Sequence, residues 1–98
     1  MDKVDALLRE IAGMPDLASM DQRSAGFLND VAEIYERHGS GATRAYLLNL
    51  GGRRNRPEVP GLIKIIGKLE ASPEVRTNRA IGRQIIKCLF QLKKGVRI

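Results

Sequence analysis

The side chains best equipped for chemistry in this sequence are basic, and the densest run of them is Gly-Gly-Arg-Arg-Asn-Arg at residues 51–56. Glycines let a backbone approach a ligand closely and expose its N–H groups. Arginine presents forked donors that match phosphate oxygens, although the Gly-x-x-x-x-Gly-Lys-Ser/Thr pattern of P-loops is absent. We therefore expect Arg53, Arg54 and Arg56 to bind an anion. A solvated basic loop whose glycines cap a helix is the alternative interpretation.

A second set of basic residues has the spacing of one helix face. Between residues 73 and 94, apolar residues near Ile85 define a buried side, and basic residues gather on the opposite side. These are Arg76, Arg79, Arg83, Lys87 and Lys94. Like charges one turn apart weaken a helix by roughly 0.2–0.5 kcal/mol per pair, yet such a row suits successive phosphates of a nucleic acid. A solvated helix face is the alternative. Lys64 and Lys68, one turn apart in an apolar segment, would extend the same basic surface.

The charge of the chain is divided unevenly along its length. Residues 1–49 hold five basic and eight acidic residues, a balance of −3, whereas residues 50–98 hold twelve basic and three acidic residues, a balance of +9. Together they give the formal net charge of +6. A basic half of this kind favours an anionic partner, with nucleic acid as the leading candidate. An acidic protein partner, or head-to-tail pairing between copies, is the alternative.

Sequence-specific reading of DNA has weak support. Residues 58–94 hold two predicted helices joined near Ser72-Pro73, but the basic residues are strung along the second helix rather than grouped with polar residues at its start. Asn78 and Gln84 are available for base contacts, and Phe90 could stack on an unpaired base or pack in the core. The pattern favours contacts to the phosphate backbone, with a slight preference for RNA or single strands.

Catalytic and metal-binding chemistry is not expected. The chain has one histidine, His38, and one cysteine, Cys88, which are too few for a standard zinc site. We expect His38 to end a helix and Cys88 to be buried and unreactive. No serine or cysteine is paired in sequence with a recognisable base. We therefore expect no enzyme activity and no cofactor.

The elements that must position these residues are helices, because apolar residues recur at three- and four-residue spacing. We predict helices over residues 2–13, 19–38, 40–50, 60–71 and 73–94, with Ser40 or Thr43 as the start of the third helix and a loop over 51–60. Ser19 and Gln22 fit a capping box, Gly39 a helix end, and Ser72-Pro73 a helix start. The expected fold class is all-α: one helical domain over 1–98, a compact bundle of about five helices with the longest helix C-terminal.

These features together predict a non-catalytic nucleic-acid-binding module. The alternative is a protein-interaction or regulatory subunit of a larger assembly, for which the apolar run at residues 62–66 would supply an interface. No apolar run reaches the roughly 18 residues of a membrane span, and the acidic start of the chain is unlike a secretory signal. A single cysteine suits a reducing compartment, so we expect a cytoplasmic location and no membrane partner.

Overall fold

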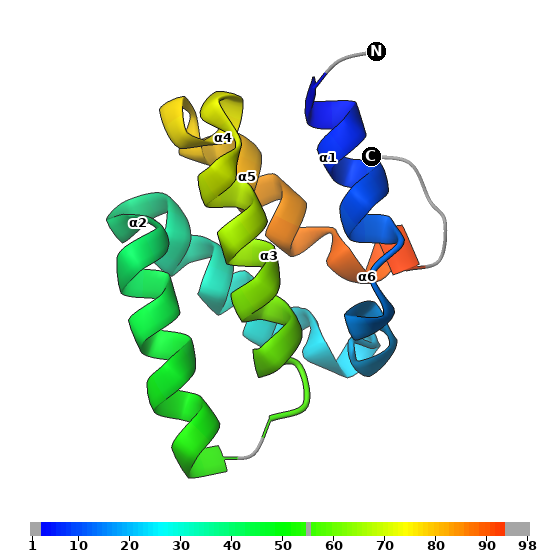
Figure 1. Ribbon diagram of the computed structural model, residues 1–98. Coiled ribbons are helices and arrows are strands. Elements are labelled where there is room, and N and C mark those ends of the chain that lie inside the picture. The colour runs from blue at the N-terminus through cyan, green and yellow to red at the C-terminus, as the bar shows by residue number, and fades with distance from the viewer. Residues whose placement is uncertain (1–2, 55, 94–98) are drawn as a thin grey trace.

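The computed structural model describes residues 3–54 and 56–93, with the side chains of Gln22, residues 50–54 and Lys93 outside the description. Within these ranges the fold is all-α and compact, as predicted, with six α-helices and two short 3-10 helices. In chain order they are α1 (Lys3–Ala12), η1 (Pro15–Ser19), η2 (Gln22–Ser24), α2 (Ala25–Arg54), α3 (Val59–Ala71), α4 (Pro73–Thr77), α5 (Arg79–Lys87) and α6 (Leu89–Lys93). Figure 1 shows their arrangement.

The longest described helix is α2, and it is broken at Gly39. This glycine has φ 89° and ψ −179°, a conformation open essentially to glycine alone. The predicted helix end at Gly39 is therefore confirmed, and a second helical part follows directly. The Thr43 hydroxyl donates a hydrogen bond to the Gly39 carbonyl oxygen at 2.7 Å and steadies the start of that part. The two parts meet at a sharp bend, and the second stands beside α3 (Figure 1).

The prediction of one long C-terminal helix is wrong. Residues 73–93 form three shorter helices, α4, α5 and α6, and the longest described helix is instead the central α2. The first break is at Asn78, whose side-chain oxygen accepts a hydrogen bond from the Ala80 N–H at 3.2 Å and caps α5. Asparagine competes for backbone hydrogen bonds in this way, which ends one helix and starts another. The second break is at Cys88 (φ −103°, ψ 10°).

Two boundary predictions are also corrected. Ser19 does not cap α2, because its hydroxyl donates to the Asp16 carbonyl at 2.8 Å. The turn before α2 is instead closed by Asp21, which accepts from the Arg23 N–H at 2.9 Å and donates its own N–H to Ser24 Oγ at 3.2 Å. The predicted loop over 51–60 is shorter, since α2 continues to Arg54 and α3 begins at Val59. The predicted helix start at Ser72-Pro73 is confirmed.

The core is formed by side chains from every part of the described chain. Large side chains that are fully buried are Ile11, Met20, Leu28, Val31, Tyr35, Leu47, Leu62, Ile65, Ile66, Leu69, Ile86 and Leu89. The first part of α2 packs against α5, where Tyr35 meets Gly82, and its second part lies beside α3, where Arg44 pairs with Glu70 (Figure 1). The apolar run at residues 62–66 is therefore buried in the core, with Ile63 partly buried against it. It does not supply the exposed interface that the sequence predicted. None of the described helices is long and apolar enough to cross a membrane.

Candidate nucleic-acid interface

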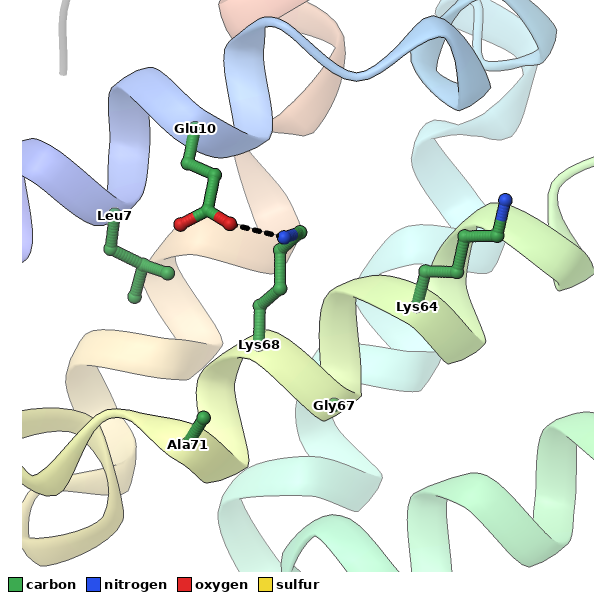
Figure 2. Close-up of a pocket in the computed structure, with 6 residues that line it drawn as sticks. All are labelled: Leu7, Glu10, Lys64, Gly67, Lys68 and Ala71. Carbon is green, nitrogen blue, oxygen red and sulfur yellow. Dashed lines mark hydrogen bonds and ion pairs between the residues drawn. The ribbon is translucent and has the colours of Figure 1, made fainter.

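Lys64 and Lys68 line one surface pocket between α1 and α3, with a volume of about 460 Å³ (Figure 2). Lys68 extends towards Glu10 of α1 and forms an ion pair with it. Lys64 is exposed, and its Nζ lies 3.3 Å from Asp16 Oδ2. Both predicted phosphate contacts are therefore already opposite carboxylates from the acidic N-terminal segment.

Arg83 is neutralised in the same way by acids of α2. Its Nη2 lies 3.0 Å from Glu33 Oε1 and its Nε lies 3.4 Å from Glu36 Oε1. These contacts bridge α5 to the first part of α2, along the seam where the two helices pack. A guanidinium held by two carboxylates must exchange at least one of them before it can bind a phosphate.

The other described residues of the predicted basic row have no such partner. Arg76 and Arg79 are exposed and Lys87 is half-buried, and no ion pair joins any of the three to a described carboxylate. Arg79 begins α5 beside the bend of α2, where its Nη1 would lie 2.9 Å from a Cβ atom placed on Gly39. Arg79 and Lys87 belong to α5, whereas Arg76 lies on α4 across the break at Asn78.

The basic run at 53–56 is only partly described. Arg53 and Arg54 occupy the last positions of α2, and their side chains, like all of Lys94, lie outside the described residues. Arg56 is half-buried, and its guanidinium carbon lies 4.5 Å from the centre of the Phe27 ring. A cation over an aromatic face is stabilised by roughly 0.5–1 kcal/mol at such a site, which fixes Arg56 against the start of α2.

Close to Arg56 lies a buried carboxylate, Glu58, that the sequence pattern did not predict. Glu58 is 6% exposed, and its Oε2 accepts a hydrogen bond from the Ser24 hydroxyl at 2.7 Å. Its Oε1 is buried and has no hydrogen-bond partner among the described residues. Buried carboxylate oxygens are normally paired, so this atom is an exception. One signal was available in the sequence: Glu58 is the only acid between Glu36 and Glu70.

Other reactive groups are dispersed. Among the described residues no three His, Cys, Asp or Glu side chains come together as a possible metal site. Cys88 is buried and accepts a weak hydrogen bond from Gln84 Nε2 at 3.3 Å, and His38 is exposed at the bend of α2. Burial raises the pKa of Tyr35 above its ordinary value of 10.0, the positive charge of Arg79 opposes this shift, and the negative charge of Glu70 adds to it.

The chain matches no protein-family model, and it has no match among curated proteins or solved structures. Any function must therefore be argued from its own side chains. The predicted basic residues divide into two described groups. Lys64, Lys68 and Arg83 face carboxylates, and Arg56, Arg76, Arg79 and Lys87 do not.

Proposed function

We propose that this protein is a non-catalytic nucleic-acid-binding module that contacts the phosphate backbone of RNA or single-stranded DNA. The observation that carries the proposal is the group of described cations of the predicted basic surface that lack a carboxylate partner: Arg56, Arg76, Arg79 and Lys87. Arg53 and Arg54 join this group by their place in the sequence, next to Arg56. With a net charge of +6, the protein attracts polyanions over the distance of a Debye length.

The basic residues are expected to differ in their contribution to nucleic-acid affinity, according to whether each already faces a carboxylate. A free guanidinium or ammonium group that meets a phosphate releases the counterion condensed there. A cation that already faces a carboxylate must give up that contact, so its net contribution is smaller. We therefore expect Arg76, Arg79 and Lys87 to matter more than Lys64, Lys68 and Arg83, although both trios carry the same charge.

Two triple variants test this ranking. In the first, Arg76, Arg79 and Lys87 are changed to Ala, and in the matched control Lys64, Lys68 and Arg83 are changed to Ala. Binding of labelled single-stranded RNA, single-stranded DNA and duplex DNA is measured at about 50 and 200 mM salt. We expect the first variant to lose at least about tenfold in affinity, and the dependence of log affinity on log salt to flatten by about 2–3. The control variant should keep most of the affinity and most of the salt dependence.

Wild-type binding that does not change with salt contradicts the proposal, and so does an equal loss in the two variants. An equal loss would mean that affinity depends only on the net charge of the protein and not on a particular surface. Circular dichroism and thermal melting of each variant establish that it is folded, which is needed because Arg83 bridges α5 to α2.

One observation favours the alternative, a protein-interaction or regulatory subunit. Leu48, on the second part of α2, is the one large apolar side chain exposed among the described residues, at 60%. Of the residues one turn before it, Ala45 is exposed and uncharged, and Arg44 is paired with Glu70. Under this alternative, Leu48→Asp abolishes binding of a protein partner or self-association, as sedimentation would show. The same substitution leaves nucleic-acid affinity within about twofold.

A further inference from the structure

A second pocket lies where the start of α2 meets the start of α3, and it has a volume of about 490 Å³. Ser24 and Glu58 line it from the buried side, and Arg23, Asp21 and Arg56 also contribute to its wall. The Arg23 side chain is 95% exposed, while Arg56 is held over Phe27. The pocket therefore combines cationic side chains with a buried acceptor.

The acceptor is the unpartnered oxygen of Glu58. Ser24 is 2% exposed, and its hydroxyl hydrogen is committed to Glu58 Oε2, while its oxygen accepts the Asp21 N–H. In the described part of the chain no further donor reaches Oε1, although only 6% of the residue is exposed. A carboxylate oxygen can only accept hydrogen bonds. The group that completes this site must therefore bring an N–H or O–H donor.

The surroundings select a neutral donor over a cation. Two arginines and two carboxylates, those of Asp21 and Glu58, line the pocket, and Arg23 pairs with Asp21 at 3.9 Å, so the formal charges of this lining balance and a neutral donor leaves them balanced. Among the described residues no third carboxylate is near enough to Glu58 and Asp21 to build a metal site. An exocyclic amino group of a nucleobase is a neutral donor, and its nucleotide also carries a phosphate for an exposed arginine. Arginine planes and aromatic rings are common stacking partners of unpaired bases.

We propose that Glu58 Oε1 accepts a hydrogen bond from the amino group of an unpaired nucleobase that enters this pocket beside Arg56. The inference rests on the proposed function and deepens it, because it names the ligand as single strands with amino-bearing bases. Cytosine presents an amino group where uracil presents a carbonyl oxygen, and a glutamate carboxylate accepts from the first and repels the second. Oε1 has under 1 Å² of accessible surface, so a side chain that lines the pocket moves when the base binds.

The test compares labelled oligocytidylate, oligoadenylate and oligouridylate of one length at one salt concentration. We expect the wild-type protein to bind the cytidine and adenosine strands at least about fivefold more tightly than the uridine strand. Glu58→Gln should bring the ratio of cytidine to uridine affinity close to one, because an amide both accepts and donates. Asp30→Asn is the matched control: it changes the charge equally at an exposed position of α2 and should leave the ratio unchanged.

Equal wild-type affinity for cytidine and uridine strands overturns the inference and leaves the proposed function standing. A preference that survives in folded Glu58→Gln overturns it as well. Direct binding of a labelled lysine-rich peptide in the absence of any strand, lost in Glu58→Gln and unaffected by free cytidine, would assign the pocket to a cationic ligand instead. Absence of binding to all three strands at low salt removes the proposed function itself. Should Glu58→Gln be found unfolded by circular dichroism, a wild-type ratio close to one still overturns the inference by itself.

Discussion

Tyr35 of α2 fills the space that any side chain at Gly82 of α5 would need. A Cβ atom at position 82 would lie 2.3 Å from Tyr35 Cε1 and 2.8 Å from its hydroxyl oxygen. The ring is 2% exposed and surrounded by core residues, so it has no room to retreat. This contact sets how closely α2 and α5 approach, and with it where Arg79 and Arg83 lie relative to α2.

Gly82→Ala should therefore lower the free energy of unfolding by about 1–3 kcal/mol, the usual cost of forcing a methyl group into a packed core. Chemical denaturation measures the loss. Gly67→Ala is the matched control, because a Cβ atom on this helical glycine of α3 meets nothing within 4 Å. It should raise stability by about 0.5–1 kcal/mol. Similar effects of the two substitutions would contradict the proposed packing of α5 on Tyr35.

Gly39→Ala should destabilise the bend of α2. The φ of 89° is unfavourable for any residue with a Cβ atom, and that atom would also lie 2.9 Å from Arg79 Nη1. The expected cost is about 1–3 kcal/mol in thermal or denaturant unfolding. Two residues further along, Gly41→Ala meets nothing within 4 Å and should be neutral or stabilising. A neutral Gly39→Ala would mean that α2 can run straight through residue 39.

Substitutions of Ser24 and Glu58 should have non-additive effects on the free energy of unfolding, because a hydrogen bond joins the two side chains. Ser24→Ala removes the donor from a buried carboxylate whose other oxygen is already unpartnered, and we expect a loss of about 1–3 kcal/mol. In a Glu58→Leu background the same substitution should cost clearly less, about 0.5–1.5 kcal/mol, because only the hydrogen bond that Ser24 Oγ accepts from the Asp21 N–H is then lost. A double-mutant cycle by urea denaturation measures the difference. Additive effects would show that the two side chains do not interact.

Tyr35 should make stability fall at alkaline pH. Its pKa is raised in the folded protein, chiefly by burial, so the folded state holds the phenolic proton more tightly than the unfolded state does. Below pH 10.0, the ordinary pKa that Tyr35 has in the unfolded chain, its contribution to the free energy of unfolding is fully present. This contribution is lost as the pH rises through the folded pKa, at up to about 1.4 kcal/mol per pH unit. Urea denaturation of wild type and Tyr35→Phe from neutral pH upward checks this. Parallel curves for the two proteins would refute it.

Local signals in the sequence predicted most of the helix boundaries well. Gly39 marked the end of a helix because only glycine takes the conformation found there, and Ser72-Pro73 marked a start because proline fits the first turn. The break at Asn78 was missed, since helical apolar spacing continues across it. The asparagine cap could have revealed it, but such a residue is also common on exposed helix faces.

The pairing of the basic residues could not be predicted, because it depends on the tertiary fold. Lys68 meets Glu10 from 58 positions away, and Lys64 meets Asp16 from 48 positions away. The sequence has an acidic half and a basic half, and the fold brings some acids of the first half into ion pairs with some basic residues of the second. Glu58 was missed for the same reason: its burial beside Ser24, 34 positions away, follows from how α3 packs at the start of α2.

The packing of α2 along α5 also has a consequence during synthesis. Glu33 and Arg83 are 50 positions apart, so the ribosome must translate about 50 further codons before α5 can cover the apolar side of α2. At common elongation rates this takes roughly 3–10 s. Throughout that interval Tyr35, which is buried against Gly82 of α5 in the finished protein, lacks its partner helix. The nascent chain therefore presents a transient apolar surface of the kind that chaperones recognise.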